Sequence, residues 1–474
     1  MSQFDDSYLS LPNFFYQVNK PKIFSKSKIF ILNKILLKDV YPFIKEVDLK
    51  KILLERKKKK KYFSQAYSGH QFGHFTNLGD GRAIIIGEHT LKNNQRVDIQ
   101  LKGCGTTKYS RGGDGKATLK SMLKEYIISE AIHYLKIPTS RSLAVFKTGE
   151  KIHRENLNDG AVLARIMNSH IRVGTFEYAA FFGNINYLNS LTNYTVKRLY
   201  PNLLINNNIA LNFLEIVMRK QIDLVVNWMR VGFIHGVMNT DNTSISAETF
   251  DYGPCAFINK YNPNTCYSSI DYYNRYSFGN QSKIIKWNIS RFAETLLPII
   301  NENQKKAIKL AQNILDKFDE IWNKKFYKMM LQKIGIKKEN QKTYILVDNL
   351  LNIMLKNNLD YTNTFYKLTY GNIKINKSPN SEFDIWKNDW NKFTDDFSNK
   401  KEIKKIMKNN NPIIIPRNQT VEQAIEETIN GNKTLFCKLH GYLTSPYKYQ
   451  NNIEKFMQPP SEEFEDCYKT YCGT

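Results

Sequence analysis

Cysteine is scarce in this chain, with six residues among 474, and no two of them form a CxxC pair. The pattern argues against a zinc ribbon and against the disulfide framework of a small secreted protein. The first residues, Met1–Asp6, also lack the basic stretch and the apolar run of a secretory signal peptide. We therefore expect a protein of the reducing cytoplasm.

Long apolar runs are missing as well. The most apolar stretch, Ile222–Met238, is interrupted by Asp223, Asn227, Arg230 and His235. A membrane-spanning helix needs about 20 predominantly apolar residues, so this stretch cannot cross a bilayer. The sequence predicts no membrane partner.

The signatures of two common enzyme classes are absent. There is no GxxxxGK[ST] segment, which excludes a simple P-loop enzyme. There is no HExxH segment either, and the two histidines that lie four residues apart, His70 and His74, precede a glycine-rich turn. We expect them to pack or to form hydrogen bonds rather than to hold a metal ion.

Acidic residues are few relative to basic ones. There are 44 Asp and Glu against 69 Lys and Arg, which gives a net charge of +25. Such an excess suits nucleic acid, an anionic membrane or a polyphosphate ligand. The basic residues are scattered along the whole chain and follow no single stripe. Charge alone therefore predicts no nucleic-acid partner.

The pattern of the chain changes at Tyr67. From there to Arg172 it is rich in glycine, histidine, arginine and aspartate, and short apolar runs alternate with turn signals. This pattern predicts a small β-rich region with one prominent helix. The expected strands are Arg82–Glu88, Arg96–Lys102, Leu143–Thr148 and Ala161–Ile166, and the expected helix is Ala117–Leu135, which Pro138 ends.

After Arg172 the pattern becomes helical, with helices expected at Ala210–Val231, Ile284–Ile300, Gln304–Lys324 and Val421–Ile429. Between the first two, His235–Pro254 is typical of a loop with a strand pair. We expect an α+β, protein-kinase-like fold with a small β-rich N-lobe and a larger helical C-lobe. The expected division is an N-terminal extension (1–66), an N-lobe with the nucleotide-binding turns (67–160), and a helical C-lobe that carries the catalytic loop, the metal-binding motif and the tail (161–474).

Four elements follow the order of the catalytic groups in kinases. Lys102 ends a strand on its polar face, and Glu125 lies on the next helix, where it can orient the lysine. Asp241 and Asn242 offer a carboxylate and an amide oxygen on a loop. Asp251 begins an Asp-Tyr-Gly sequence, which resembles the Asp-Phe-Gly that holds magnesium in kinases. Each signal is weak alone, but their order favours a site for ATP and a divalent cation, Mg²⁺ or Mn²⁺.

Five blocks of the sequence closely resemble the selenoprotein O family. They are Tyr67–Ala83 (YSGHQFGHFTNLGDGRA), Leu101–Ala131, Ile137–Leu143 (IPTSRSL), Gly160–Glu177 (GAVLARIMNSHIRVGTFE) and Gly232–Pro254. Members of this family are protein adenylyltransferases with a protein-kinase fold. The resemblance implies that ATP binds reversed relative to kinases, so that AMP is transferred to hydroxyl side chains of protein substrates.

The resemblance also implies a role for each matching residue. Asp241 matches the catalytic base, and Asn242 and Asp251 match the metal ligands. The residues that match nucleotide-binding positions are Gly79, Gly81, Arg82, Lys102, Asp114, Gly115, Arg165, Arg172 and Asp251, with Glu125 as the partner of Lys102. Two arginines seven residues apart suit a multiply charged phosphate chain better than a single lysine does.

Three alternatives stay open at this point. The first is transfer of UMP from UTP with manganese, and the second is a protein kinase that transfers the γ-phosphate. The third is a catalytically inactive, pseudokinase-like scaffold that only binds ATP. The adjacent Asp241–Asn242 pair, without a His-Arg-Asp loop, argues against the kinase, and the full set of metal and phosphate ligands argues against the scaffold.

The resemblance points, finally, to a redox latch. The family commonly ends in a redox-active cysteine or selenocysteine, and Cys472 is third from the end of this chain. Cys266 lies fifteen residues after Asp251, where kinase-like folds carry the activation segment. A Cys266–Cys472 disulfide is therefore expected to hinder substrate access when oxidised. Cys467 is a rival partner, and two unpaired thiols are the alternative.

Overall fold

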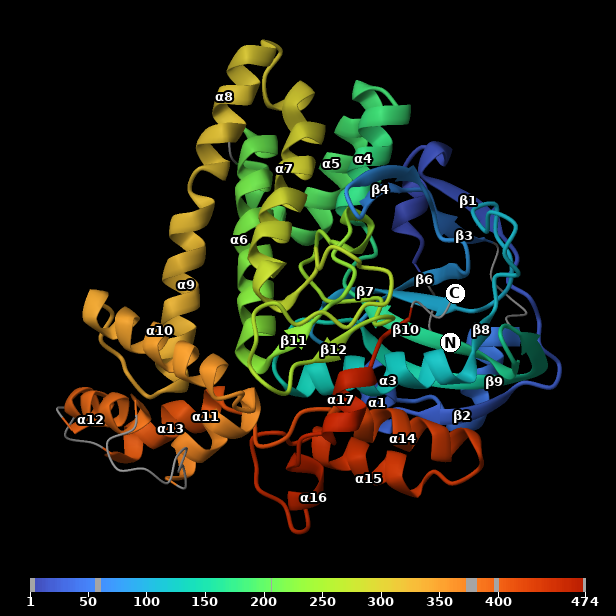
Figure 1. Ribbon diagram of the computed structural model, residues 1–474. Helices are drawn as coiled ribbons and strands as arrows, with labels where there is room; N and C mark the ends of the chain where they lie inside the picture. The colour runs from blue at the N-terminus through green and yellow to red at the C-terminus, as the bar shows by residue number, and fades with distance from the viewer. Residues whose placement is uncertain (1–4, 56–60, 206, 372–381, 396–399, 472–474) are drawn as a thin grey trace.

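The computed structural model describes residues 5–55, 61–205, 207–371, 382–395 and 400–471. Figure 1 shows a β-rich lobe beside a lobe of long helices, with the last helices of the chain returning beneath the sheet. The expected α+β class, a β-rich lobe followed by a larger helical lobe, is confirmed. Within the described residues, no helix combines the length and the apolar composition that crossing a membrane requires.

The β-rich lobe is built on one sheet of eight strands, which pair antiparallel. The order along the sheet is β1-β3-β6-β7-β10-β9-β2, and β8 pairs with β10. The bounds are β1 Tyr16–Asn19, β2 Lys28–Leu32, β3 Tyr62–Gln65, β6 Ala83–Thr90, β7 Arg96–Lys102, β8 Ala117–Thr118, β9 Arg141–His153 and β10 Leu157–Met167. A separate hairpin is formed by β4 (Ser68–Gln71) and β5 (His74–Asn77).

The first 66 residues belong to this lobe and are not an extension of it. They supply β1, β2 and β3, and thereby satisfy the edges that β6 and β9 would otherwise expose. The expected boundary at residue 160 falls inside β10. The sequence pattern missed this arrangement because the pairing partners of β1 and β2 lie far along the chain, at β3 and β9.

Strand β7 matches its expected bounds, and six of its seven residues are buried. Val97, Ile99 and Leu101 join an outer core with α1 (Lys34–Val40) and α2 (Glu46–Lys50). Gln100 and Lys102 lie on the opposite face, as period-two alternation requires. Strand β10 places Arg165 directly opposite Gln100. The sheet therefore presents buried polar side chains toward the helical lobe.

The helix expected over Ala117–Leu135 is observed as α3, Leu119–Tyr134. Thr118 caps its start by accepting a hydrogen bond from the Ser121 backbone N–H at 3.2 Å. The helix packs against β9 and β10 and turns Glu125 toward the sheet. Glu130 points elsewhere and pairs with Arg141 at 2.7 Å.

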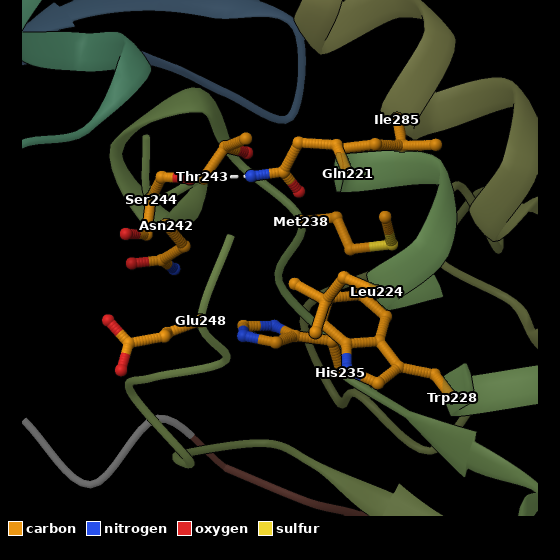
Figure 2. Close-up of a pocket in the computed structure, with 10 residues that line it drawn as sticks. All are labelled: Gln221, Leu224, Trp228, His235, Met238, Asn242, Thr243, Ser244, Glu248 and Ile285. Carbon is orange, nitrogen blue, oxygen red and sulfur yellow. Dashed lines mark hydrogen bonds between the residues drawn. The ribbon is translucent and has the colours of Figure 1, made fainter. Parts of the chain in front are cut away.

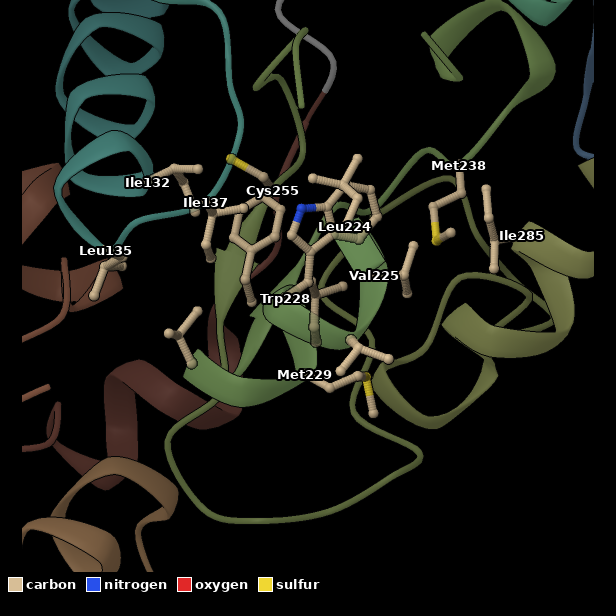
Figure 3. Close-up of a cluster of buried hydrophobic side chains, with 14 of the residues drawn as sticks. Ile132, Leu135, Ile137, Leu224, Val225, Trp228, Met229, Met238, Cys255 and Ile285 are labelled. Atoms are coloured by element: carbon tan, nitrogen blue, oxygen red, sulfur yellow. The ribbon is translucent and has the colours of Figure 1, made fainter. Parts of the chain in front are cut away.

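Helix α6 (Ile209–Val231) is the central helix of the helical lobe, close to its expected bounds, and Gly232 ends it with a φ of 76°. Figure 3 shows how its buried face joins the two lobes. Side chains of α6 pack there with residues from α3, from the loops that follow α3 and α6, and from α7 (Gln281–Ile300). The labelled residues are Ile132, Leu135, Ile137, Leu224, Val225, Trp228, Met229, Met238, Cys255 and Ile285.

The single helix expected over Gln304–Lys324 is wrong, because two helices are present, α8 (Gln304–Leu315) and α9 (Phe318–Lys333). The break has a packing reason: α8 packs against α7, whereas α9 packs against α6, and Phe318 at the start of α9 is buried. The packing of α9 against α6 therefore outweighs the helical periodicity, which continues through the break in the sequence.

The remaining helices complete the helical lobe and the tail. They are α4 Val173–Phe182, α5 Ile185–Leu199, α10 Gln341–Lys356, α11 Tyr361–Tyr370, α12 Glu382–Asp395, α13 Lys400–Asn410, α14 Asn418–Ile429, α15 Thr434–Leu443, α16 Glu454–Met457 and α17 Glu462–Cys467. Helix α14 contains the expected helix Val421–Ile429. With α15 it packs against α3, so the end of the chain braces the helix that carries Glu125 (Figure 1).

The loop between α6 and α7 holds the residues expected to carry the chemistry. Within it, strands β11 (Phe233–Ile234) and β12 (Ala256–Phe257) pair antiparallel on either side of residues 235–255. A strand pair was expected within His235–Pro254. The observed pair flanks these residues instead of lying among them. Inside the loop, Thr240–Asn242 forms a 3₁₀ turn.

A buried ion pair ties the tail to the helical lobe. The Arg417 guanidinium donates two hydrogen bonds to Asp360, at 2.8 and 3.0 Å, and one to the side-chain oxygen of Asn259 at 2.8 Å. The Arg417 side chain is 2% exposed. Asp360 also caps α11 through the Asn363 backbone N–H.

We expect Arg417→Ala to lower the free energy of unfolding by about 3–5 kcal/mol, because it leaves Asp360 largely buried without its partner. Urea denaturation followed by circular dichroism measures the change. Lys392→Ala, which removes an exposed pair with Asp389, is the matched control and should change little. Equal stability of the Arg417 variant and the wild type would contradict the role assigned to this pair.

Candidate active site

Four charged side chains from four elements meet between the sheet and the helical lobe. Lys102 Nζ on β7 lies 2.7 Å from Glu125 Oε2 on α3, and it also contacts Asp251 Oδ1. Arg165 Nη1 on β10 lies 3.0 Å from Glu125 Oε1 and 2.8 Å from Asp251 Oδ1. The side chains of Lys102, Glu125 and Arg165 are at most 8% exposed, and that of Asp251 is 26% exposed. Two cations and two carboxylates thus compensate one another in a nearly dry site.

Asp251 is held in a specific electrostatic and backbone state. Burial raises its pKa, but the adjacent charges of Arg165 and Lys102 outweigh burial and hold the pKa well below its usual range. Its φ of 62° is uncommon for a residue with a Cβ and is maintained by its neighbours. His235 Nε2 donates to the Phe250 carbonyl at 3.0 Å, next to Asp251 in the chain. The Tyr252 hydroxyl bonds to Thr139 on the other side.

Arg172 adds a third buried cation, immediately before α4. Its Nε donates to the His170 carbonyl at 3.1 Å and its Nη1 to the Asp241 carbonyl at 3.3 Å. The guanidinium lies 4.0 Å from the centre of the Tyr67 ring. Within the described residues, Nη2 has no hydrogen-bond acceptor. A buried donor without an acceptor costs about 1–3 kcal/mol, so an anionic oxygen is a fitting ligand here.

Asp80 is a site residue that the sequence reasoning missed. It is buried, accepts hydrogen bonds from Gln65 N and Gln100 Nε2, and forms a long ion pair with Arg172 Nη2 at 3.6 Å. Burial raises its pKa, although the charge of Arg172 acts in the opposite direction. The available signal was its position between two glycines, Gly79 and Gly81.

Asp241 is a buried carboxyl, 7% exposed, in the Thr240–Asn242 turn. Its Oδ2 accepts a hydrogen bond from Gln71 Nε2 at 3.4 Å, and its Oδ1 has no partner among the described residues. Burial raises the pKa of Asp241 to about 7, although Arg172 lowers it. Such a carboxyl has the proton affinity that general base catalysis near neutral pH requires.

The β4–β5 hairpin covers this carboxyl and is clamped to its loop. His70 N donates to Thr240 Oγ1 at 2.7 Å, and His70 Nδ1 and Thr240 Oγ1 both bond to the carboxylate of Glu177, at 2.6 and 2.5 Å. A Cβ on Gly69 would lie 2.7 Å from Asp241 Oδ1, so only glycine permits this approach. The sequence reasoning missed Gln71, Thr240 and Glu177, since their partners are brought together only by the fold.

Asn242 lies beside Asp241 and is half-buried. Its Nδ2 donates to the Val237 carbonyl at 3.1 Å, which fixes the orientation of the side-chain amide. Figure 2 shows Asn242 at the edge of an enclosed cavity behind the loop, with His235, Glu248 and Met238 around it. The cavity measures about 10 Å³, the space of one water molecule and far too small for a nucleotide.

The glycine turns that were expected to contact the nucleotide are tightly packed. Gly79 has a φ of 111°, and a Cβ there would lie 2.3 Å from the Tyr109 ring. Gly81 meets the Tyr109 carbonyl in the same way, at 2.8 Å, and the Arg82 carbonyl accepts from Gly103 N. A Cβ on Gly115 would lie 2.1 Å from a neighbouring carbonyl. These positions require glycine, although their contact with a nucleotide stays a prediction.

Asp114 lies apart from the charged cluster. It is exposed and forms two hydrogen bonds with Arg154, at 3.0 and 2.9 Å. These bonds lower its pKa. The structure therefore gives Asp114 a partner that the sequence did not indicate, and its contact with a nucleotide stays a prediction.

The oxygen donors of Asn242 and Asp251 fit a hard divalent cation. Both cationic partners of Asp251 engage the same oxygen, Oδ1. Within the described residues, no three His, Cys, Asp or Glu side chains cluster as metal ligands. Mg²⁺ is commonly bound by one or two carboxylates together with substrate phosphates and water. The Asp251 carboxylate and the Asn242 amide oxygen are donors that suit such a site.

The tail reaches the segment that carries Cys266. Thr470 N donates to the Tyr267 carbonyl at 2.7 Å, and Ser269 N donates to the Thr470 carbonyl at 3.0 Å. Cys266 is half-buried, its Sγ contacts Asp271 at 3.4 Å, and burial raises its pKa to about 11. Cys472 lies outside the described residues, so the Cys266–Cys472 latch stays a prediction.

Comparisons with known proteins agree on one family. The family model described as protein adenylyltransferase SelO matches residues 1–444. The chain is 48% identical to the protein nucleotidyltransferase YdiU of Pelagibacter ubique over 478 residues, 99% of each protein. It is 45% identical to the protein of the same name from Clostridium perfringens over 484 residues, 99% of this chain and 97% of the relative.

Two solved structures from Toxoplasma gondii are also similar. The kinase domain of a specific rhoptry antigen is 10% identical, covering 63% of this chain and 85% of that domain, with a TM-score of 0.24. ROP2, described as a virulence factor with a protein-kinase fold and no enzymatic activity, is 9% identical, covering 72% and 85%, with a TM-score of 0.23. The α+β class of this chain is assigned from its own helices and strands and not from these two structures.

We expect Arg172→Met to weaken ATP binding by about tenfold or more, because a charge-assisted hydrogen bond contributes about 1.5–3 kcal/mol. The measurement is isothermal titration calorimetry with ATP and MgCl₂. Arg219→Met removes an exposed arginine on α6 and should leave binding unchanged. Unchanged affinity in the Arg172 variant would remove this residue from the anion site.

Proposed function

The chain belongs to the protein adenylyltransferase SelO family and is a nucleotidyltransferase, and on that premise we propose that it transfers AMP from ATP to hydroxyl side chains of proteins in the cytoplasm. The observation that carries this proposal is the arrangement of three buried cations next to one buried carboxyl with an unpartnered oxygen. The cations suit a triphosphate, and the carboxyl suits the acceptor hydroxyl.

The phosphate chain is bound by Lys102, Arg165 and Arg172 in this proposal. Lys102 and Arg165 each contact both Glu125 and Asp251. When a triphosphate binds, these cations exchange their contacts with Asp251 for phosphate oxygens, and Glu125 keeps both of them oriented. Arg172 Nη2 gains the acceptor that it lacks.

Asn242 and Asp251 would hold the divalent cation, Mg²⁺ or Mn²⁺, and when bound it neutralises charge on the phosphates. The low pKa of Asp251 keeps its carboxylate ionised at neutral pH, which is the form a cation requires. The hydrogen bond from Asn242 Nδ2 to Val237 leaves the amide oxygen available.

Asp241 acts as the general base. Its unpartnered Oδ1 takes the proton of the acceptor hydroxyl, and the hydroxyl oxygen attacks the α-phosphorus of ATP. The bond between the α-phosphorus and the bridging oxygen breaks, and pyrophosphate leaves. Gln71 holds the other oxygen of Asp241 and so orients the carboxyl.

The direct test uses ATP labelled at the α-phosphate or, separately, at the γ-phosphate, with a mixture of acceptor proteins. Transfer of label from the α position alone is the expected result. Transfer from the γ position alone would establish a protein kinase instead, and intact ATP binding without transfer would establish an inactive scaffold. Repeating the assay with α-labelled UTP and MnCl₂ decides between AMP and UMP.

We expect Asp251→Ala to abolish both metal-dependent ATP binding and transfer, because no neighbouring carboxylate replaces the charge between metal and phosphates. Calorimetry with and without MgCl₂ and the α-label assay measure the two losses. Asp319→Ala, on the exposed face of α9, is the control. A transfer rate close to the wild type would show that Asp251 is not a metal ligand.

Asp241→Ala should separate binding from chemistry. Loss of a general base lowers the transfer rate by about 10²–10⁴-fold, whereas ATP affinity should stay within about twofold of the wild type, because Asp241 faces the acceptor. The α-label assay at saturating ATP and calorimetry are the two measurements. Equal losses of affinity and rate would place Asp241 among the metal ligands.

A further inference from the structure

Two arginines lie over one tryptophan beside the β4–β5 hairpin. The Arg275 guanidinium carbon is 4.8 Å from the centre of the Trp287 ring, and the Arg291 guanidinium carbon is 5.1 Å from it. All three side chains are half-buried. Arg275 lies in the loop between β12 and α7, whereas Trp287 and Arg291 lie one turn apart on α7. We call this group the Arg275–Trp287–Arg291 stack.

The stack adjoins the hairpin that covers Asp241. Trp287 packs edge-on against His70, with ring centres 5.2 Å apart, and His70 N bonds to Thr240 next to the base. Arg275 approaches the tip of the hairpin, where a Cβ on Gly73 would lie 3.8 Å from its guanidinium carbon. Because this hairpin covers Asp241, we expect a polypeptide that presents a hydroxyl to Asp241 to pass beside the hairpin and the stack.

The positive charge of the stack is only partly compensated. Arg291 forms a surface ion pair with Glu294 at 2.5 Å, one turn along α7, and pairs of this kind contribute little. Among the described residues, no carboxylate lies within ion-pair distance of the Arg275 guanidinium, because Asp271 bonds to the Arg275 backbone N–H instead. The Nε atoms of both arginines have no hydrogen-bond acceptor there.

Exposed aromatic side chains continue the same surface. Tyr272 is 85% exposed and Tyr273 is 95% exposed, and they lie three and two residues before Arg275 in the chain. Guanidinium groups that rest on an aromatic ring are held in place and keep their outer N–H groups for a ligand. Planar, oriented guanidiniums suit carboxylates in particular, since they can donate two parallel hydrogen bonds.

We propose that the Arg275–Trp287–Arg291 stack binds acidic side chains next to the acceptor hydroxyl, so that this enzyme selects serine, threonine or tyrosine residues in acidic segments of proteins. The inference rests on the proposed function, because it assigns the stack to the acceptor protein. It adds the substrate class, which neither the charged cluster nor Asp241 determines. The net charge of +25 assists the encounter with such segments.

The test is a binding measurement that needs no chemistry. Two fluorescein-labelled peptides are compared by anisotropy at physiological ionic strength, one with a central serine flanked by glutamates and one with glutamines in their place. We expect the glutamate peptide to bind about tenfold more tightly to the wild type, as one charge-assisted hydrogen bond produces. This preference should be lost in Arg275→Gln combined with Arg291→Gln.

Lys286→Gln is the matched control for net charge. Lys286 lies on α7 next to Trp287, is half-buried like the two arginines, and pairs with Asp319. Each single substitution, Arg275→Gln, Arg291→Gln or Lys286→Gln, removes one positive charge, but only the arginine variants should weaken binding of the glutamate peptide. Equal weakening by Lys286→Gln would show a general effect of charge, and equal binding of both peptides to the wild type would show no acidic preference. Either result overturns the proposal.

Transfer kinetics separate this inference from the proposed function. With α-labelled ATP and the glutamate peptide, Arg275→Gln combined with Arg291→Gln should raise KM for the peptide about tenfold and leave kcat unchanged. An unchanged KM would overturn the inference while the adenylyltransferase assignment stands. Conversely, a wild type that binds the glutamate peptide selectively but transfers no label to any acceptor would overturn the proposed function alone.

Discussion

The site depends on compensating buried positive charge. Lys102, Arg165 and Arg172 are nearly inaccessible to water, and an unpaired buried charge costs several kcal/mol. Glu125 and Asp251 compensate Lys102 and Arg165, and Asp80 lies 3.6 Å from Arg172. The pairs with Glu125 and Asp251 fix β7, β10, α3 and the loop after β11 relative to one another. The C-terminal helices α14 and α15 brace α3 from outside, so the end of the chain also serves this cluster. When a polyphosphate binds in the proposed way, its oxygens replace Asp251 as the negative partner of Lys102 and Arg165. The protein then needs no additional positive charge.

The second constraint is the exclusion of water from Asp241. The β4–β5 hairpin lies so close to this carboxyl that Gly69 cannot carry a side chain. The resulting burial raises the proton affinity of Asp241, and the hydrogen bond from Gln71 holds one oxygen while leaving the other free. The β4–β5 hairpin thus contacts both Asp241, the proposed general base, and the Arg275–Trp287–Arg291 stack. In our proposals, proton transfer and the choice of acceptor therefore depend on the same short hairpin.

Sequence patterns predicted local features well and long-range pairing poorly. The bounds of β7 and α6 follow from side-chain periodicity. The order Lys102, Glu125, Asp241, Asp251 indicated one site because it follows the order of the catalytic groups in kinases. The strands within the first 66 residues were missed, since their partners are distant, and the break before Phe318 was missed because packing overrides periodicity. Gln71 and Glu177 carry no local signal, and the only local signal of Asp80 is its position between two glycines. Their importance arises from contacts that only the folded chain creates.

In the proposed reaction the three cations hold the triphosphate with its α-phosphorus toward Asp241. A crystal structure of the protein with Mg²⁺ and an ATP analogue that has a methylene group between the α- and β-phosphorus atoms tests this arrangement. We expect phosphate oxygens in contact with Lys102, Arg165 and Arg172, and the α-phosphorus nearer to Asp241 than the γ-phosphorus. A γ-phosphorus nearest to Asp241, or a triphosphate bound away from the three cations, would contradict it.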